Sequence, residues 1–165
     1  MNNLKEILIL NTGGTFCKVY NELTGLLEVQ SNNNSIESIL KISKIYNIKV
    51  KGLIYKDSLD ITNKDRKKLL DCIKNKYYKK IIIIHGTDTI NITAKYLAKN
   101  LKQMQIVLTG AMKPFSIEPI EATSNLMSAF GFLQSCNTNN IYISMHGQVK
   151  QYKKLKKNKS QGIFE

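Results

Sequence analysis

Small, polar and glycine residues gather in five short clusters, and these are the first candidates for chemistry in the sequence. A threonine hydroxyl is a weak nucleophile by itself, so it needs a nearby base and donors that stabilise the charge developing on an attacked carbonyl oxygen. The clusters offer hydroxyls, carboxylates, lysines and backbone N–H groups at glycine turns. They occupy residues 11–15 (NTGGT), 56–60 (KDSLD), 85–89 (HGTDT), 109–114 (TGAMKP) and 146–148 (HGQ).

Two of these clusters, residues 12–15 and 85–89, favour covalent catalysis. The first has two adjacent glycines with a hydroxyl on each side, and it lacks the GxxxxGK[ST] and GxGxxG spacings of phosphate and dinucleotide loops. The second supplies a further hydroxyl, a carboxylate and backbone N–H groups at the start of an expected helix. For Asp88, capping of that helix is an equally good explanation.

Each polar cluster follows a short apolar run, and these runs are the expected strands. Their Ile, Val and Leu residues show no polar face, which predicts a sheet covered on both sides. Helical patterns lie between them, so the sequence predicts an α/β fold: an open, mostly parallel sheet with helices on both faces, three-layered and Rossmann- or flavodoxin-like, with right-handed crossovers. The expected strands are 7–10, 48–55, 81–84, 105–108 and 141–145, and the expected helices are 35–44, 62–75, 89–100 and about 119–134.

A parallel sheet brings all five clusters to one edge. The carboxyl ends of parallel strands open on the same side, where open α/β proteins bind their ligands. Any single cluster is explained by turn formation, because glycine and threonine are common turn residues. Five clusters at one edge predict a binding crevice there.

Composition narrows the class of protein. The chain has 165 residues, which fits one domain, and its three cysteines have no CxxC spacing, so we expect reduced thiols and no metal site. The apolar run near the N-terminus is too short for a signal sequence and no run approaches the roughly 20 residues of a membrane span, so we expect a cytoplasmic protein without membrane contact. The net charge of +13 is almost wholly lysine, with Arg66 the only arginine, which favours a generally basic surface over a nucleic-acid site.

At this point the sequence resembles a known family. Residues 12–15 and 85–89 resemble the two signature motifs of the bacterial-type L-asparaginases, in the same order and at similar spacing. Residues 56–60 look like the substrate-binding loop of that family, and residues 107–114 like the strand that follows. The ending, through residues 155–165, is similar to that of short asparaginases without a second domain. The resemblance implies that residues 1–165 form a single domain with the fold of the N-terminal asparaginase domain.

The resemblance also implies catalytic roles. Thr12 would be the primary nucleophile, and Thr87, Asp88 and Lys157 would form a proton-relay group beside it. Lys157 belongs to a basic C-terminal segment, residues 150–165, in which a lysine would otherwise be a solvated charge.

A mobile lid is implied for residues 16–30, where Tyr20 would help to activate the threonine. His85 ends an apolar run and is better explained as a hydrogen-bonded structural residue, while His146 fits a turn at the end of a strand. We therefore expect neither histidine to be the catalytic base.

Substrate binding is implied for the loop after the second strand. Ser58 would hold the α-carboxylate of a free amino acid, and Asp88 would also pair with its α-ammonium. Asp57, Leu59 and Gly86 are expected in the same binding group.

Two departures from the family pattern bear on this site. The usual Ser-Asp-Gly near the fourth helix is missing, with Glu121 at about the place of the aspartate, so we expect altered subunit contacts and weaker local support of the site. Leu59 stands where two-domain enzymes carry a polar contact, and we expect a looser grip on the ligand. Two-domain enzymes also use a glutamate from the second domain of a neighbouring subunit, and we do not expect this chain to supply it.

The expected function is an L-asparagine amidohydrolase that forms L-aspartate and ammonia through a threonine ester, with no cofactor. The sequence does not rank asparagine against glutamine, because one methylene in a pocket changes discrimination by only about 1–3 kcal/mol. We expect a homodimer or homotetramer. Two alternatives stay open: a non-catalytic module that binds asparagine or aspartate, and an ammonia-producing subunit of an amidotransferase.

Overall fold

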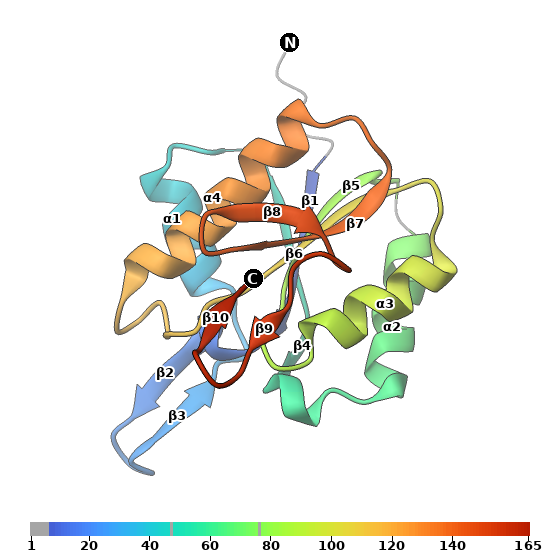
Figure 1. Ribbon diagram of the computed structural model, residues 1–165. Coiled ribbons are helices and arrows are strands. Elements are labelled where there is room, and N and C mark those ends of the chain that lie inside the picture. The colour runs from blue at the N-terminus through green and yellow to red at the C-terminus, as the bar shows by residue number, and fades with distance from the viewer. Residues whose placement is uncertain (1–6, 47, 76) are drawn as a thin grey trace.

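The structure is built on a six-stranded sheet with helices on both faces (Figure 1). The computed structural model describes residues 7–46, 48–75 and 77–165. The strand order is β4-β1-β5-β6-β7-β8, and every neighbouring pair is parallel except β7 and β8. The strands of this sheet are β1 (Ile7–Gly13), β4 (Lys49–Lys56), β5 (Lys80–Ile84), β6 (Gln105–Thr109), β7 (Asn140–Met145) and β8 (Gln148–Gln151).

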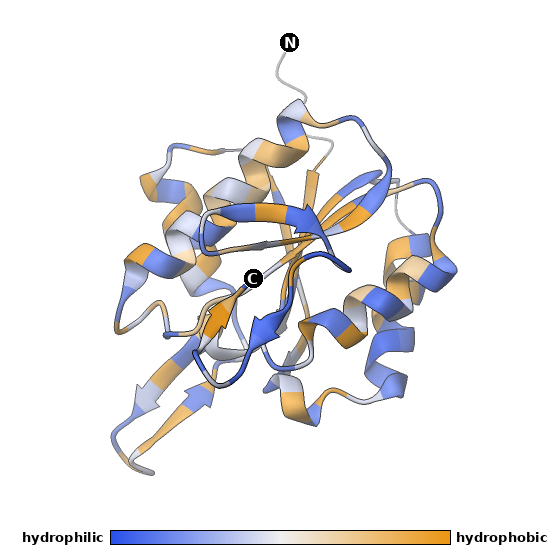
Figure 2. Cartoon of the chain, viewed as in Figure 1, coloured by the Kyte–Doolittle hydropathy of each residue, from blue (hydrophilic) through white to orange (hydrophobic). Residues whose placement is uncertain are grey.

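Alternation along the strands gives the sheet two hydrophobic cores. In β1, Leu8 and Leu10 enter one core while Ile7 and Ile9 enter the other, because successive side chains of a strand point to opposite faces. Figure 2 shows the central strands largely apolar and the helices banded with hydrophilic and hydrophobic residues. The expected three-layer α/β fold is confirmed.

Four helices form the outer layers, two on each face. One core takes the apolar stripes of α2 and α3, and the other takes those of α1 and α4. The helix α2 begins at a capping box, in which Thr62 and Asp65 each satisfy the backbone N–H of the other. None of the helices in the described part of the chain has the length and apolar character of a membrane-spanning segment. The helices are α1 (Asn34–Ile42), α2 (Asn63–Lys74), α3 (Ile90–Asn100) and α4 (Pro119–Ser135).

One crossover corrects the expectation that all of them are right-handed. The chain moves across the sheet in the same direction from β5 to β6 and from β6 to β7, yet α3 and α4 cover opposite faces, so these two connections have opposite hands. Parallel crossovers are right-handed in about 98% of cases, and the three other connections share one hand, which makes the β6–α4–β7 connection left-handed. The face that α4 leaves free is covered by the C-terminal segment, whose Leu155 and Phe164 lie in the same core as α3.

Several short elements were not expected from the sequence. After β1 come the 3-10 helix η2 (Thr15–Cys17) and an antiparallel hairpin, β2 (Lys18–Asn21) and β3 (Leu26–Val29). A second 3-10 helix, η3, follows β4, and two short strands close the chain. These are η3 (Ser58–Asp60), β9 (Lys157–Asn158) and β10 (Ile163–Phe164).

Candidate functional site

The loops after β1, β4 and β5 meet in direct backbone contact at the carboxyl edge of the sheet. A Cβ atom on Gly14, whose φ is +79°, would lie 2.4 Å from the backbone N and Cα of Gly86. A Cβ atom on Gly86 would lie 2.6 Å from the Cβ of Ser58. Since real Cβ atoms do not approach other atoms so closely, both glycines are required. We refer to this junction of the loops that carry Thr15, Ser58 and Thr87 as the crevice, after the crevice expected from the sequence.

The two hydroxyls of the first motif have different surroundings. Thr12 is fully buried, and its Oγ1 donates a 2.7 Å hydrogen bond to the carbonyl of Ile84. Thr15 is partly exposed, and its hydroxyl has no hydrogen-bond partner among the residues that the structure describes. A nucleophile must reach a substrate, so this geometry speaks against Thr12 and favours Thr15. The strand continues through Gly13, and Thr12 therefore stays on the buried face of Leu8 and Leu10.

The expected relay residues are brought together by Lys157. Its Nζ donates to Thr87 Oγ1 at 2.9 Å and to Asp88 Oδ1 at 2.8 Å. The side chain of Lys157 is 13% exposed and that of Asp88 is 33% exposed, so the ion pair is sheltered without being sealed from a ligand. Lys157 is therefore not a solvated charge of the C-terminal segment.

The alternative that Asp88 merely caps α3 is wrong. The N-cap residue is Thr89, and no side chain supplies a capping hydrogen bond. Thr89 Oγ1 donates instead to the carbonyl of Ser58 at 2.7 Å, which ties the start of α3 to the loop after β4. The Asp88 carboxylate is left to Lys157 and to whatever enters the crevice.

The loop after β4 turns its three predicted residues in different directions. Ser58 is 1% exposed, and its hydroxyl has no hydrogen-bond partner among the described residues. Every fully enclosed side-chain nitrogen or oxygen in those residues does have a partner. The Ser58 hydroxyl is therefore not fully enclosed, and it accounts for the exposed part of the residue. Leu59 is 70% exposed and lies outside the contact. The sequence expectation for this loop thus fits Ser58 best.

Asp57 stabilises the loop and the adjacent hairpin. Its Oδ1 accepts from the N–H of Leu59 at 3.1 Å, and its Oδ2 pairs with Lys18 at 2.7 Å. Burial raises the pKa of the Asp57 carboxyl, but Lys18 and the backbone donors together outweigh burial and leave the pKa below its usual value. Because both oxygens are already engaged, Asp57 is positioned to hold the loop rather than to bind a ligand.

Tyr20 lies apart from the other expected site residues. It is 56% exposed on β2, opposite Leu27, in a hairpin that extends away from the sheet in Figure 1. The base of the hairpin is fixed, since Ser116 Oγ donates to the carbonyl of Lys18 at 2.8 Å. In this conformation Tyr20 forms no hydrogen bond with the described residues of the crevice.

His85 has the structural role expected of it. It is fully buried, with Nδ1 2.8 Å from the carbonyl of Gly86 and Nε2 2.8 Å from Thr93 Oγ1. The pKa of His85 is lowered to about 4, chiefly by burial; the hydrogen bond to the Gly86 carbonyl raises the pKa and the charge of Arg66 lowers it, both by less than burial does. The ring is therefore neutral near pH 7 and enclosed, which excludes it as a base that meets substrate.

Glu121 supports the fourth loop, contrary to the expectation of weakened support. Its carboxylate accepts from the backbone N–H groups of Met112 at 2.9 Å and Lys113 at 3.1 Å. Its Oε1 also lies 3.3 Å from His146 Nε2, while His146 Nδ1 accepts from the N–H of Phe164 at 3.2 Å. Glu121 thus holds both the fourth loop and the segment that follows Lys157. His146 itself sits in the expected turn, with φ 51°.

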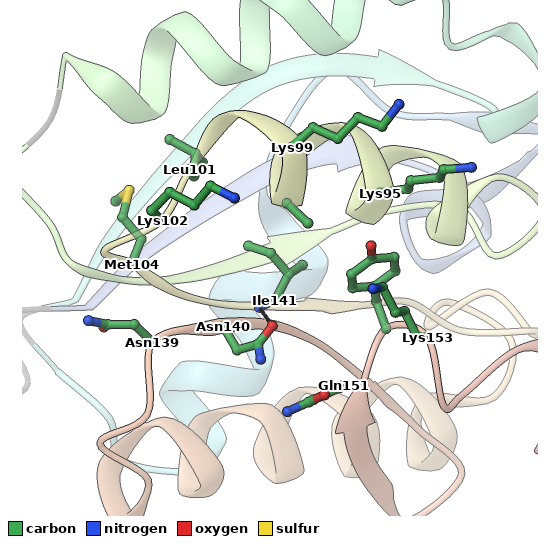
Figure 3. Close-up of a pocket in the computed structure, with 12 residues that line it drawn as sticks. Lys95, Lys99, Leu101, Lys102, Met104, Asn139, Asn140, Ile141, Gln151 and Lys153 are labelled. Atoms are coloured by element: carbon green, nitrogen blue, oxygen red, sulfur yellow. Dashed lines mark hydrogen bonds between the residues drawn. The ribbon is translucent and has the colours of Figure 1, made fainter.

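A separate hollow of about 550 Å³ lies at the opposite edge of the sheet (Figure 3). It adjoins Asn140, where β7 begins, and its lining includes Lys95, Lys99, Lys102 and Lys153. The described lining has no serine, threonine, histidine or carboxylate. The hollow therefore lacks the grouping of threonine hydroxyls with a carboxylate that lies at the other edge, and volume alone does not locate the chemistry. Within the described residues no three His, Cys, Asp or Glu side chains form a group that could hold a metal ion.

Comparison with known proteins gives one consistent family. The family described as "Asparaginase, N-terminal" matches residues 6–164. A glutamyl-tRNA(Gln) amidotransferase subunit from Methanococcus vannielii is 29% identical over 152 residues, which is 89% of this chain and 35% of that protein. L-asparaginase 2 of Bacillus subtilis is 29% identical over 136 residues, covering 77% of this chain and 36% of that protein.

Solved structures agree with the sequence comparison. The thermostable L-asparaginase of Thermococcus kodakarensis superposes with a TM-score of 0.79 at 27% identity, over 96% of this chain and 50% of that one. A probable cytoplasmic L-asparaginase of Campylobacter jejuni has the same fold, with a TM-score of 0.75 at 20% identity, over 96% of this chain and 52% of that one. This chain spans about a third of the curated relatives and about half of the solved chains.

Proposed function

Because the chain belongs to the N-terminal asparaginase family, we propose that it is an amidohydrolase that converts L-asparagine to L-aspartate and ammonia. The observation that carries the proposal is the pair of hydrogen bonds from Lys157 to Thr87 and Asp88, beside the contact of Gly14 with Gly86. A hydroxyl, a carboxylate and an ammonium at one crevice are the groups that threonine-based acyl transfer needs.

The proposed reaction has two steps. The Thr15 oxygen attacks the amide carbon, its proton passes to Thr87 Oγ1 as the hydroxyl proton of Thr87 moves on to the leaving nitrogen, and backbone N–H groups near Thr87 and the glycine turn stabilise the oxyanion. The carbon–nitrogen bond breaks, the leaving nitrogen takes a proton, and ammonia departs from an aspartyl ester on Thr15. Water then attacks the ester by the same route, which restores the hydroxyl and releases aspartate.

Lys157 and Asp88 would have separate electrostatic roles, one toward Thr87 and the other toward the substrate. The Lys157 ammonium donates to Thr87 Oγ1 and so lowers the cost of removing the proton of that hydroxyl. Asp88 Oδ1 is held by Lys157, which leaves Oδ2 for the α-ammonium of a free amino acid. The hydroxyl of Ser58 is suited to the α-carboxylate. Reading both ends of the amino acid would fix the amide near Thr15.

Thr15 is proposed as the nucleophile in place of Thr12, and a pair of variants separates them. Thr15→Ala should reduce ammonia release from L-asparagine by about 10⁴-fold or more, because losing a nucleophile removes the covalent route. Thr12→Val keeps the shape of the buried side chain and loses only the hydrogen bond to Ile84, so it should retain turnover within about tenfold.

If Thr15→Ala released ammonia at nearly the parent rate, and if a fully folded Thr12→Val lost this activity, Thr12 would be the nucleophile. Circular dichroism of both variants supplies the folding control. Assays of L-glutamine and D-asparagine beside L-asparagine define the substrate. The role of Tyr20 stays a prediction that requires the hairpin to move, and Tyr20→Phe tests it in the same assay.

A second candidate is an ammonia-producing component of an amidotransferase. Relatives named as subunits of a glutamyl-tRNA(Gln) amidotransferase favour it, as does the net charge of +13. Such a component would bind tRNA with an affinity that falls steeply as salt rises. Asparagine turnover that is complete without tRNA, and unchanged by it, favours the asparaginase.

A non-catalytic binding module would bind aspartate in calorimetry and release no ammonia.

The cytoplasmic location and the homodimer or homotetramer are likewise proposals. Sedimentation of the purified protein measures its assembly, and fractionation of the cell measures its location.

A further inference from the structure

A chain of buried polar side chains runs from α2 to the edge of the crevice. Arg66 Nε lies 3.1 Å from Thr93 Oγ1, Thr93 Oγ1 lies 2.8 Å from His85 Nε2, and His85 Nδ1 lies 2.8 Å from the carbonyl oxygen of Gly86. Thr93 and His85 are fully buried, and Arg66 is 6% exposed. The proposed reaction uses none of these three side chains.

The direction of every bond in this chain is fixed by chemistry. A carbonyl oxygen only accepts, so His85 Nδ1 must carry the hydrogen that meets Gly86. The ring is neutral, so Nε2 is bare and accepts the hydroxyl hydrogen of Thr93. The guanidinium only donates, so Arg66 Nε gives its hydrogen to the Thr93 oxygen. Three successive donors therefore point from a cation to one carbonyl.

Arg66 is an expensive residue to bury in this position. It forms no salt bridge with a described carboxylate, and its Nη1 donates a second hydrogen bond to Asn63 Oδ1 at 3.2 Å. A buried cation without a paired anion costs free energy unless its hydrogen bonds recover it. The guanidinium charge of Arg66 therefore acts on the series of hydrogen bonds that ends at the Gly86 carbonyl.

The end of the chain is the peptide unit next to the relay hydroxyl. The Gly86 carbonyl and the Thr87 N–H belong to the same planar peptide, and aligned hydrogen bonds polarise one another. The backbone before it is also tied down, because the His85 N–H donates to the Thr109 carbonyl at 2.8 Å. The Thr87 N–H has no acceptor among the described residues, which leaves it available to a ligand.

We infer that Arg66, Thr93 and His85 are positioning residues, which fix and polarise the Gly86–Thr87 peptide so that the Thr87 N–H can stabilise the oxyanion. The inference rests on the proposed amide hydrolysis. The three side chains touch no substrate and act only through the backbone that they hold.

The kinetic test is Thr93→Val with Thr93→Ser as its matched control. Valine keeps the volume and breaks both central bonds, so kcat should fall about 10- to 100-fold while KM changes less than about threefold, because the peptide donor acts mainly in the transition state. Serine keeps the hydroxyl and should stay within about threefold of the parent. Ile83→Val, a fully buried change on β5 two residues before His85 that removes no hydrogen bond, should lower stability and leave kcat unaltered.

Equal losses in Thr93→Val and Ile83→Val at equal stability would overturn the positioning role. So would a change in KM alone. If Thr93→Val does not fold, Arg66→Met offers a second break at the far end of the chain, with the same expected split between kcat and KM.

A spectroscopic test examines the hydrogen-bond chain without changing Arg66, Thr93 or His85. The protein has two histidines, so ring ¹⁵N spectra of the parent and of His146→Gln assign His85 directly. The chain requires a neutral His85 ring with hydrogen on Nδ1 at pH 6. Hydrogen on Nε2, or a charged ring at that pH, would disprove it. If the parent released no ammonia from any amide, the proposed function would fail and the positioning role with it, whereas the ring state would still show whether the chain exists.

Discussion

The crevice at the carboxyl edge and the hollow at the amino edge use the same residue type in opposite ways. In the crevice, Lys157 is 13% exposed and bonded to both Thr87 and Asp88. In the hollow, Lys99 and Lys102 are exposed and form no salt bridge with a described carboxylate. A lysine is therefore suited to a catalytic role by hydrogen-bonded partners that are sheltered from solvent, and not by the size of the cavity beside it.

Charge distribution explains the difference. Residues 89–117 and 122–164, which build most of the hollow, contain no aspartate or glutamate. A hollow of that composition can attract anions but cannot exchange protons in the way that an acid and a base do.

Lys157→Met should have the largest effect of the four changes. It removes the ammonium that holds Thr87 and Asp88, and loss of a group that assists proton transfer costs about 10²- to 10⁴-fold. We expect kcat for ammonia release to fall about 10³-fold with the fold retained, as checked by circular dichroism. A loss of less than about threefold would mean that Lys157 is a surface charge after all.

Gly86→Ala should damage the crevice, with Gly131→Ala as its control. A Cβ on Gly86 would lie 2.6 Å from Ser58 Cβ, so the loop must move, and a displacement near 1 Å costs about 100-fold in turnover. A Cβ on Gly131 in α4 meets nothing within 4 Å, and it should stabilise the protein by about 0.5–1 kcal/mol. Turnover and urea unfolding are measured on both, and equal behaviour would contradict the close contact of the loops.

The buried histidine gives a pH dependence of stability. The pKa of His85 is about 4 in the folded protein against 6.5 for an unperturbed ring, so acid protonates the unfolded chain first. The free energy of unfolding should therefore fall by about 2 kcal/mol between pH 7.5 and pH 5. His85→Gln should flatten this slope in urea titrations, and an unchanged slope would show that the ring is not enclosed.

Removing two lysines from the hollow should have the smallest effect. The double change Lys99→Gln and Lys102→Gln alters exposed side chains, so stability should move by less than about 0.5 kcal/mol. We expect kcat/KM for asparagine to stay within about twofold of the parent. A tenfold loss would mean that the hollow is linked to the reaction, and the contrast between the two regions would then fail.

The sequence was sufficient for the elements that local patterns specify. The expected strand 81–84 became β5 (Lys80–Ile84), and the expected helix at about 119–134 became α4 (Pro119–Ser135), because apolar runs and helical stripes are local signals. The convergence of the polar clusters on one edge followed from the parallel sheet. The grouping of Lys157 with Asp88 came only from the family resemblance, since the two residues are 69 positions apart.

What could not be predicted depended on three-dimensional arrangement. The sequence predicted Thr12 as the nucleophile, whereas the burial of Thr12 favours Thr15; two hydroxyls three residues apart look equivalent until the end of β1 is known. The hydrogen-bond chain of Arg66, Thr93 and His85 joins α2, α3 and the loop after β5, and these distant residues form no sequence motif. The left-handed crossover was missed because the hand of a connection depends on which face is already occupied.

The left-handed crossover also has a consequence for the order in which function is lost. It leaves open a face that the C-terminal segment covers, and that segment delivers Lys157 through two short strands and the buried Leu155 and Phe164. Small elements with few backbone hydrogen bonds open before a central sheet does. Mild denaturant should therefore detach this segment and abolish the proposed ammonia release while the six-stranded sheet is still folded.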